Sequence, residues 1–356
     1  MRVVVVGATG NVGTSVLQAL AHESEVDSVL GLARRRPDAA FAKTDWREVD
    51  IDGDDLEPHF RGAEAVVHLA WKIQPSRDLA ALRRTNVHGS RRVFDAVAAA
   101  GVPSLVYASS VGVYSAGPKD RQVDESWRRD GITTSFYGRH KAEVEHLLDI
   151  FEKEHPETRV VRLRPGLVFK RDAAEGIRRL FLGPLLPSPL ARPGLIPLVP
   201  DVPGLRFQAV HSLDLGEAYR LVIVGDARGA FNIAADPVLD GKALAGALGA
   251  RPVPVPPGFL RGAAGLTWRL GLQPTPAGWI DLALGVPLMD VSRARTELGW
   301  EPRQSSVEAF LDLMRGVRER RGLPTPPLSP ESSGAARAHE MATGVGQYDM
   351  GEEKGR

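Results

Sequence analysis

The amino-terminal residues 1–22, MRVVVVGATGNVGTSVLQALAH, decide the fold of this chain. Arg2–Val6 is a short, continuous run rich in valine, which is typical of a parallel strand buried on both faces of a sheet. Residues 7–13 follow as a loop with three glycines, and residues 12–22 are predicted to form a helix. Four apolar residues share one face of that helix: Val12, Val16, Leu17 and Leu20. A strand, a glycine loop and a helix are therefore expected in direct succession.

This strand–loop–helix unit is suited to bind a phosphate group. Glycines allow a tight turn and let backbone N–H groups approach a phosphate, and the N-terminus of the following helix favours negative charge. Gly7, Gly10 and Gly13 are spaced G-x-x-G-x-x-G, whereas the common dinucleotide fingerprint is G-x-G-x-x-G. Because the loop follows the first strand directly, we interpret it as a dinucleotide-binding loop despite this spacing.

Short apolar runs alternate with helix-like segments through the amino-terminal half. Further strands are expected at residues 28–33, 65–70, 105–109 and 160–163, and long helices at 79–100 and 137–154. Strands that alternate with helices indicate parallel βαβ units. We predict an α/β fold, a doubly wound parallel sheet of the Rossmann type with a smaller, mixed C-terminal substrate-binding region.

The carboxy-terminal half has a different texture. Residues 182–205 contain seven prolines, which excludes a long helix or a central strand. We interpret this stretch either as a loop packed over a pocket or a partner, or as an ordinary surface connection. A strand is expected at 230–234 and a helix at 305–320, whereas the composition of residues 322–356 predicts a disordered tail. The predicted domains are a nucleotide-binding domain of residues 1–169, to which 207–235 return, and a substrate-binding region of 170–206 and 236–321.

The composition limits the partners of the chain. In 356 residues, Lys+Arg 45 nearly balance Asp+Glu 44, so no net field attracts nucleic acid. The chain has Cys 0, which excludes disulfides and cysteine metal sites, and its histidines form no H-E-x-x-H motif. The start is unlike a signal peptide, and no apolar run reaches the ~20 residues of a membrane helix. We expect a cytoplasmic protein that binds a small molecule, with no metal, nucleic acid or membrane as partner.

Three consecutive arginines follow the second predicted strand. A cofactor with a free ribose 2′-hydroxyl requires an acidic residue at this position. The chain instead has Ala33 followed by Arg34, Arg35 and Arg36. Guanidinium groups match a phosphate in geometry and charge, so Arg34 and Arg35 favour NADP over NAD. The alternative interpretation is a solvated basic turn.

Tyr137 and Lys141 are a candidate acid–base pair. Positions four residues apart share one face of a helix, so the phenol and the ammonium are expected side by side. A free phenol, with a pKa near 10, is a poor base at neutral pH. A cation about 6 Å away is expected to stabilise the phenolate by roughly 2–3 kcal/mol, or about two pKa units. The pair is also common by chance, so it gains weight only together with other motifs.

Several motifs occur in a characteristic order along the chain. They are residues 7–13, Ala65-Val-Val-His-Leu-Ala70, Thr85-Asn-Val-His-Gly89, Val106-Tyr-Ala-Ser-Ser-Val-Gly-Val-Tyr114, Tyr137-Gly-Arg-His-Lys141, Arg162-Leu-Arg-Pro-Gly166, Val210-His-Ser-Leu-Asp214, Phe231-Asn-Ile-Ala234 and Leu298-Gly-Trp-Glu-Pro302. From Met1 to about Arg320 the chain resembles the extended short-chain dehydrogenase/reductases, specifically the NAD-dependent epimerase/dehydratase group. Each motif alone is loose, but the ordered series is specific.

The resemblance implies a catalytic set and a cofactor-binding set. Ser110 matches the catalytic Ser/Thr that hydrogen-bonds the reacting substrate oxygen, Tyr137 matches the acid/base, and Lys141 matches the residue that binds the nicotinamide ribose and keeps the tyrosine acidic. The cofactor-binding residues that it implies are Gly7, Gly10, Asn11, Val12, Gly13, Asp50, Ile51, Leu69, Ala70, Asn86, Lys141 and Pro165. Asn86 has an equally good structural interpretation, as a buried side chain that holds neighbouring backbone. The family also suggests a homodimer.

Three functions remain open. The first is an NAD(P)-dependent epimerase-type oxidoreductase that acts on a hydroxyl or keto carbon, as in a nucleotide sugar. The second is a net NADPH-dependent carbonyl reductase, and the third, least expected, is a non-catalytic dinucleotide sensor. The family's R-P-x-N-x-Y-G pattern is replaced by Arg164-Pro-Gly-Leu-Val-Phe-Lys170, which weakens the case for a nucleotide-diphosphate substrate. Val111 and Gly112 stand where dehydratases carry Asp-Glu, so dehydration is not expected.

Overall fold

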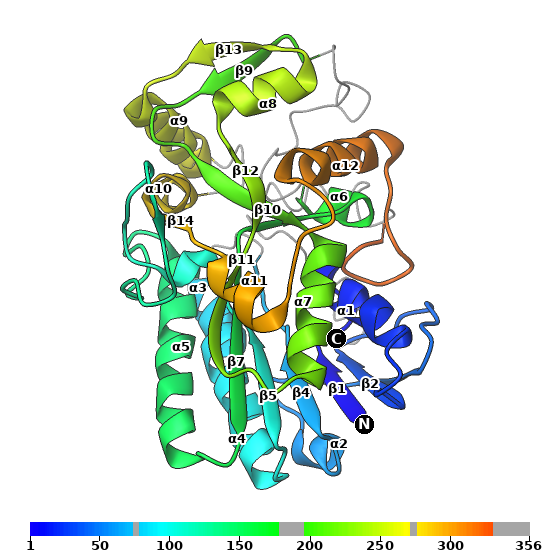
Figure 1. The fold of residues 1–356 in the computed structure, drawn as a ribbon. Coiled ribbons are helices and arrows are strands. Elements are labelled where there is room, and N and C mark those ends of the chain that lie inside the picture. Colours follow the sequence, from blue (N-terminus) through cyan, green and yellow to red (C-terminus); the bar gives the residue numbers. More distant parts are fainter. Residues whose placement is uncertain (74–77, 178–195, 271–275, 330–356) are drawn as a thin grey trace.

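The computed structural model describes residues 1–73, 78–177, 196–270 and 276–329. Its main element is a seven-stranded sheet in the order β11-β7-β5-β4-β1-β2-β3, in which every neighbouring pair is parallel. The strands are β1 (Arg2–Val6), β2 (Ser28–Ala33), β3 (Thr44–Glu48), β4 (Ala65–His68), β5 (Ser104–Ala108), β7 (Arg159–Pro165) and β11 (Gly229–Ile233). This is the doubly wound order of the Rossmann type with one further strand, so the predicted fold is confirmed (Figure 1).

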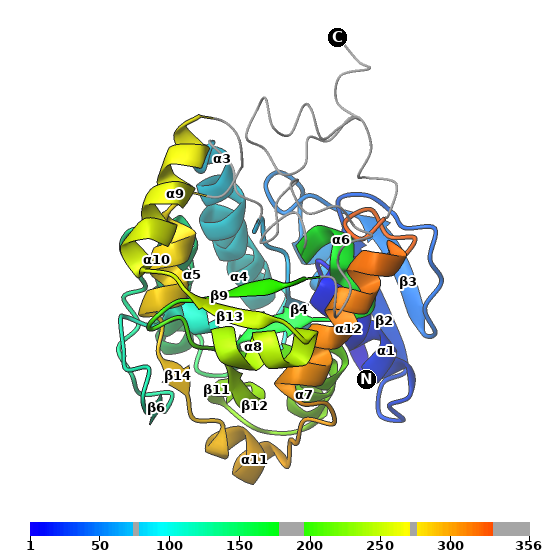
Figure 2. The same cartoon turned by 90° about the horizontal axis from the view of Figure 1, so that it is seen from above.

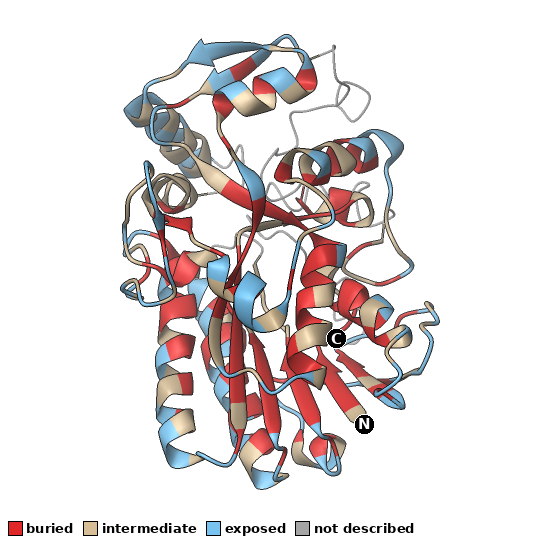
Figure 3. Cartoon of the chain, viewed as in Figure 1, coloured by how far each residue is buried: buried red, intermediate tan, exposed pale blue. Residues whose placement is uncertain are grey.

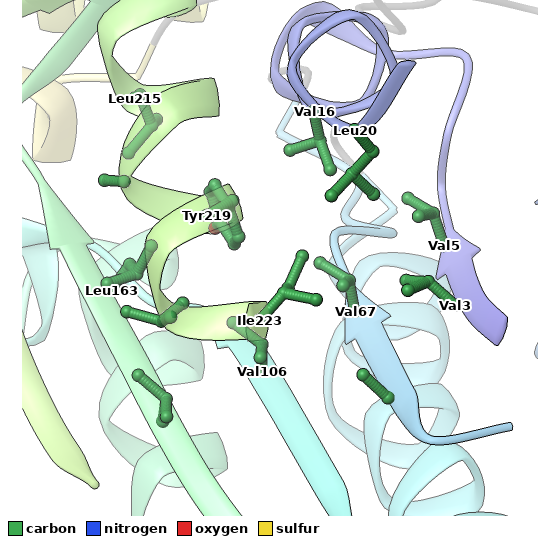
Figure 4. Close-up of a cluster of buried hydrophobic side chains, with 14 of the residues drawn as sticks. Val3, Val5, Val16, Leu20, Val67, Val106, Leu163, Leu215, Tyr219 and Ile223 are labelled. Carbon is green, nitrogen blue, oxygen red and sulfur yellow. The ribbon is translucent and has the colours of Figure 1, made fainter. Parts of the chain in front are cut away.

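The valine run of β1 supplies the centre of two cores. Val3 and Val5 belong to a cluster on one face of the sheet, beneath α1 (Asn11–Ala21) and α7 (Ser212–Val224). Val4 and Val6 belong to the cluster on the other face. That second cluster is covered by α2 (Glu57–Phe60), α4 (Ser90–Ala99) and α5 (Phe136–Glu154). Because successive side chains of a strand point to opposite faces, four valines in a row suit a strand with helices on both sides. Figure 4 shows the first of these cores.

Two elements of the amino-terminal half differ from the prediction. The helix expected at 79–100 is divided into α3 (Leu79–Arg83), a π-helical stretch η1 (Arg84–Gly89) and α4. A widened turn of this kind alters which side chains face inward, and the apolar periodicity does not reveal it. Strand β3 was not expected, because its sequence TDWRE buries only Trp46 at the edge of the sheet.

The C-terminal region forms smaller sheets, of which one mixes parallel and antiparallel pairs. Strands β8 (Leu167–Phe169), β10 (Phe207–His211) and β12 (Ala235–Leu239) form a three-stranded sheet in which β10 pairs parallel with β8 and antiparallel with β12. Two-stranded parallel sheets join β9 (Leu198–Asp201) to β13 (Arg251–Pro254) and β6 (Gln122–Val123) to β14 (Leu288–Met289). The helices of this region are α6 (Ala174–Ile177), α8 (Gly241–Leu248), α9 (Pro257–Arg269), α10 (Gly278–Gly285), α11 (Ser292–Leu298) and α12 (Ser306–Glu319).

The C-terminal elements lie mainly above one end of the large sheet (Figure 1). Of the segment 207–235, only β11 enters that sheet, whereas β10 belongs to the three-stranded one. The predicted disordered tail begins too early in the sequence, because Thr325 and Leu328 are buried and Leu328 packs in the C-terminal core. Residues 330–356, and 182–195 of the proline-rich stretch, lie outside the described residues. Among the helices of the described ranges, none is long and apolar enough to cross a membrane.

Candidate active site

The glycine loop joins β1 to α1 at the carboxyl edge of the large sheet. Gly7 has φ +86°, and a Cβ on it would lie 2.6 Å from the backbone nitrogen of Ala70. A Cβ on Gly13 would lie 2.6 Å from the carbonyl oxygens of Ala8 and Gly7. The fold itself therefore requires glycine at positions 7 and 13.

Gly10 differs from Gly7 and Gly13, because neither its backbone conformation nor its contacts within the protein require a glycine. Its backbone is extended, with φ −77° and ψ 179°, and a Cβ would meet only the carbonyl oxygen of Gly7, at 3.6 Å. Gly10 is the N-cap of α1, which has no side-chain cap and no acidic residue in its first turn. Asn11 and Val12 provide the first backbone N–H groups of the helix, which have no acceptor within it. A glycine that no contact within the protein requires, placed before an uncapped helix N-terminus, is consistent with close approach of a pyrophosphate.

Lys170 lies behind the first turn of α1, and sequence reasoning did not identify it as a site residue. Its Nζ donates to the carbonyl oxygen of Asn11 at 3.0 Å and to the hydroxyls of Thr14 and Ser15 at 2.6 and 3.1 Å. Burial lowers the pKa of Lys170 to about 8. These three hydrogen bonds of Lys170 hold the first turn of α1, which follows the glycine loop. The Oδ1 of Asn11, in the same turn, is buried and has no hydrogen-bond partner among the described residues.

The three consecutive arginines directly follow strand β2, as predicted. Strand β2 ends at Ala33, and Arg34, Arg35 and Arg36 follow it as exposed residues. The backbone N–H of Arg36 donates to Glu48 at the end of β3, at 3.0 Å. Their position beyond the carboxyl end of β2 is the one at which a ribose substituent is bound in doubly wound folds.

Asp50 and Ile51, which the family resemblance implies to be cofactor-binding, lie in a loop held by neighbouring residues. Ile51 is buried and lies against Gly89, where a Cβ would meet its Cδ1 at 2.8 Å, and Asp50 accepts from the backbone N–H of Asp52 at 3.0 Å. Arg92 of α4 donates to the carbonyl oxygen of Ile51 at 2.9 Å. Contacts from Gly89 and Arg92 therefore hold this loop.

Asn86 holds the backbone after β4. It is fully buried; its Oδ1 accepts from the N–H of Lys72 at 2.7 Å, and its Nδ2 donates to the carbonyl oxygen of Lys72 at 3.0 Å. The structural interpretation of Asn86 thus accounts for its contacts. Leu69 and Ala70 lie in the backbone segment that this pairing fixes, and Ala70 abuts Gly7.

Ser110, Tyr137 and Lys141 are brought together beside this segment. Ser110 follows β5, and its Oγ accepts from the N–H of Gly112 at 3.0 Å. A Cβ on Gly112 would lie 2.7 Å from Cε1 of Tyr137 and 3.4 Å from Oγ of Ser110, so the two side chains meet over this glycine. The Ser110 hydroxyl interacts with the Tyr137 phenol and lowers its pKa. Lys141 places its Nζ 6.0 Å from the centre of the Tyr137 ring. Pro165 is buried at the end of β7, in register with Ile233.

The electrostatics of the pair differ from the expectation. The Lys141 Nζ lies 6.0 Å from the centre of the Tyr137 ring. Burial nevertheless raises the pKa of Tyr137 to about 12, and the Ser110 hydrogen bond opposes this only in part. Burial also lowers the pKa of Lys141 well below its usual range, with the charge of Glu145 opposing it. The Lys141 Nζ donates to the carbonyl oxygen of Ala108 at 2.6 Å. The predicted lowering of the tyrosine pKa was wrong for this structure, because burial disfavours the phenolate and Lys141 is itself desolvated.

Two tryptophans enclose Tyr137. The ring of Trp279, on α10, lies 5.3 Å from that of Tyr137 at an interplanar angle of 31°, and the ring of Trp71 lies 6.1 Å away at 77°. The Nζ of Lys141 stands 3.5 Å from the centre of the Trp71 ring. Gly278 allows α10 to approach this closely, because a Cβ there would lie 2.2 Å from the carbonyl oxygen of Thr134. Trp71 could be suspected from its place after β4; no motif pointed to Trp279, which is distant in sequence.

A buried ion pair supports the segment that carries Ser110. Glu145 of α5 is fully buried, and its carboxylate accepts from Nε and Nη2 of Arg164 at 2.8 and 2.5 Å. Ser109, next to Ser110, donates to the same carboxylate at 2.5 Å. The Arg164 guanidinium holds the pKa of Glu145 down, at about 2, against the opposing effect of burial. This pair therefore links α5, β7 and the segment after β5 that carries Ser110.

The chain is similar to several known proteins. The model of the NAD dependent epimerase/dehydratase family matches residues 3–179. An uncharacterized protein of Mycobacterium tuberculosis is 28% identical over 330 residues, 91% of this chain, but this chain spans only 31% of its length. A second uncharacterized protein of that organism is 29% identical, covering 92% of this chain and 86% of its own length.

Two further similar proteins have names that state an activity. A putative dihydroflavonol 4-reductase of Synechocystis is 30% identical over 130 residues, which are 35% of this chain and 37% of that protein. The UDP-glucose 4-epimerase of Thermus thermophilus in complex with NAD has a similar structure, with a TM-score of 0.65 and 22% identity over 89% of this chain and 99% of that one. The latter similarity supports the fold.

Proposed function

Since the chain belongs to the NAD dependent epimerase/dehydratase family of enzymes, we propose that it is an NAD(P)-dependent oxidoreductase of the epimerase type that acts on a hydroxyl or keto carbon. The observation that carries the proposal is the meeting of Ser110, Tyr137 and Lys141 next to the segment that borders the glycine loop. A non-catalytic dinucleotide sensor has no need for this set.

The glycine loop and α1 would hold the pyrophosphate of the cofactor, and the backbone of Leu69 and Ala70 would border the rest of it. When bound, the nicotinamide accepts or supplies the hydride. The exposed Arg34 and Arg35 beyond β2 support NADP, because a guanidinium matches a 2′-phosphate and no acidic residue stands at the end of β2.

Ser110 and Tyr137 would bind the reacting substrate oxygen from one side. Because burial raises the pKa of Tyr137 to about 12, the phenol is protonated at neutral pH and is ready to donate. A phenol is a stronger acid than an alcohol, so transfer of its proton to an alkoxide oxygen is favourable. In the opposite direction Tyr137 starts as the phenolate and accepts the proton of the alcohol, and Lys141 would stabilise the negative charge that the phenolate carries before this transfer. The arrangement of this chain thus favours carbonyl reduction as the easier half of the reaction.

The aromatic enclosure favours a second candidate function, net reduction of an apolar carbonyl compound. Trp71 and Trp279 present ring surface around Tyr137, and such surface binds flat or apolar groups better than it binds a hydrated sugar. The partial similarity to a putative dihydroflavonol 4-reductase points the same way. A nucleotide sugar, as in the Thermus enzyme, remains the substrate class of the first candidate.

The stoichiometry of the cofactor separates the two candidates. The purified chain is incubated with NADH or NADPH and either nucleotide sugars or aromatic and aliphatic ketones, and nicotinamide absorbance is followed. Epimerisation returns the cofactor to its starting redox state, whereas net reduction consumes one reduced cofactor for each product molecule. Trp279→Ala is expected to raise KM for an apolar ketone about tenfold or more, since it removes a large apolar contact. Absence of any hydride transfer to or from both substrate classes would contradict the proposed function.

A further inference from the structure

Lys170 is a buried cation without an ion pair among the described residues. It is 3% exposed, and its Nζ donates to three neutral oxygens, the carbonyl of Asn11 and the hydroxyls of Thr14 and Ser15. Withdrawing an ammonium group from water is costly unless a negative charge compensates it. Lys170 also stands where the family pattern R-P-x-N-x-Y-G has its last glycine, so this cation is a feature of this chain rather than of the pattern.

The ammonium group of Lys170 lies beside the first turn of α1, close to the start of α7. Ser212, the first residue of α7, donates to the same carbonyl oxygen of Asn11 at 3.2 Å, and its hydroxyl lies 2.9 Å from that of Ser15. A Cβ on Gly216 would lie 2.6 Å from the carbonyl oxygen of Ser15, so the two helices are in close contact here. Figures 1 and 2 show α1 and α7 side by side, and Figure 3 shows buried residues where they meet. Lys170 is therefore held in a fixed position next to the glycine loop.

A positive charge at the first turn of α1 needs an anion. The N-terminus of a helix carries a partial positive charge, and α1 has no charged residue and no side-chain cap that would neutralise it. Burial lowers the pKa of Lys170 to about 8, and the charge of Asp172 opposes this effect. Nearby carboxylates have partners of their own: Asp312 of α12 contacts Arg171 and His211, Asp214 of α7 accepts from the backbone N–H of Gln304, and Glu217 of α7 pairs with Arg220. The cation and the helix N-terminus thus add to one positive potential at the glycine loop.

We propose that Lys170 supplies the fixed positive charge that the pyrophosphate of the cofactor meets at the glycine loop, and that it acts through the first turn of α1. This inference rests on the proposed function, because it takes the anion to be a nicotinamide dinucleotide. Charges in a poorly hydrated site interact over several ångströms, so direct contact is not required. An anion at the loop favours the charged form of Lys170, and cofactor binding should therefore take up a proton wherever free Lys170 is partly neutral.

Calorimetric titration counts these protons. The full chain is titrated with NADP or NAD between pH 7 and 9, in pairs of buffers that differ in ionisation enthalpy. Because free Lys170 has a pKa of about 8, the wild-type Kd is expected to rise about 10-fold over this range, with up to about one proton taken up per cofactor bound. Lys170→Gln keeps a hydrogen-bond donor and removes the charge. It should weaken the binding of both cofactors about 10-fold at pH 7 and should take up correspondingly fewer protons.

Lys119→Gln is the matched control. Burial also lowers the pKa of Lys119 to about 8, but its Nζ donates to the carbonyl oxygens of Arg206 and Ala283. This variant should match wild type in cofactor affinity and in proton uptake. Lys141 also has a lowered pKa in the proposed site, so the protons assigned to Lys170 are the difference between wild type and Lys170→Gln.

The outcomes separate the role of Lys170 from the proposed function. Wild type that binds neither cofactor would overturn the proposed function and this inference with it. Wild type that binds cofactor with no proton uptake and a constant Kd would overturn the role of Lys170 alone, and this measurement requires no variant to fold. A Lys170→Gln protein that binds both cofactors as wild type does, or that takes up as many protons, would also overturn it.

Discussion

Two similar substitutions in the glycine loop are predicted to have different effects: Gly13→Ala should lower folding stability, whereas Gly10→Ala should lower cofactor affinity. In Gly13→Ala, the new Cβ lies 2.6 Å from two carbonyl oxygens of the loop, Ala8 O and Gly7 O. Both contacts are with backbone, so the loop must move. In Gly10→Ala, the new Cβ meets one carbonyl oxygen at 3.6 Å, an ordinary contact, and the backbone is extended. Gly13→Ala should therefore change the stability of the protein, whereas Gly10→Ala should leave the stability nearly unchanged.

The magnitudes follow from these contacts. Overpacking against fixed backbone costs about 3 kcal/mol, and alanine in a helix returns about 1 kcal/mol relative to glycine. Gly13→Ala is thus expected to lose about 2 kcal/mol of folding free energy, or roughly 3 °C in Tm for a chain of this size. Gly10→Ala should stay within about 0.5 kcal/mol of wild type. If the pyrophosphate packs against Gly10, the same substitution should weaken the binding of NADP about 10-fold or more, because the methyl group occupies the space of the phosphate.

Thermal unfolding and titration of nicotinamide fluorescence measure the two quantities separately. A Gly10→Ala protein that binds NADP and NAD as wild type does would refute the assignment of the pyrophosphate to this loop. A Gly13→Ala protein with an unchanged Tm would show that the loop is less constrained than its contacts indicate.

Three further predictions concern the buried charges and the arginines. Glu145→Gln leaves the Arg164 guanidinium buried without its counter-charge and is expected to cost about 3–5 kcal/mol in urea unfolding; a loss below about 1 kcal/mol would contradict this account. Burial lowers the pKa of His68 to about 3, so below pH 6.5 the unfolded chain takes up a proton that the folded chain does not, and stability falls as pH falls. Between pH 7.5 and 5 this amounts to about 2 kcal/mol, which His68→Asn should remove; an equal loss in both proteins would exclude His68 as its source. Arg34→Ala with Arg35→Ala should weaken binding of NADP about 10-fold or more and leave NAD unchanged, and an equal effect on both cofactors would exclude a 2′-phosphate site.

The sequence was most informative where one local rule decides the structure. A run of valines before a glycine loop and a helix leaves few alternatives, and the sheet order follows from repeated βαβ units. The helix at 79–100 was less predictable, because a π-helical stretch keeps the apolar residues of a helix while changing their phase. Edge strand β3 carries almost no apolar signal, since only Trp46 of it is buried.

The sequence predicted that Tyr137 and Lys141 share a helix face, but it did not predict their electrostatics. The structure places the Lys141 Nζ 6.0 Å from the centre of the Tyr137 ring. Whether a cation or burial controls the pKa depends on the residues that exclude water, and these come from distant segments. Trp279 lies 142 residues after Tyr137 in the sequence, as the two residue numbers show, yet the two rings are in contact. Lys170 likewise reaches α1 from the far end of β8, and no local pattern predicts such a contact.

The transfer of the substrate proton by Tyr137 is the central claim, and single-turnover hydride transfer tests it most directly. Nicotinamide absorbance is followed after mixing substrate with the preformed complex of cofactor and protein, for wild type, Tyr137→Phe and Tyr219→Phe. Tyr219 is a fair control because it is fully buried on α7 and its hydroxyl has no hydrogen-bond partner among the described residues. The account predicts that Tyr137→Phe slows transfer on the order of 10²–10⁴-fold with cofactor affinity unchanged, while Tyr219→Phe reacts as wild type does. A Tyr137→Phe protein that transfers hydride at the wild-type rate would contradict it.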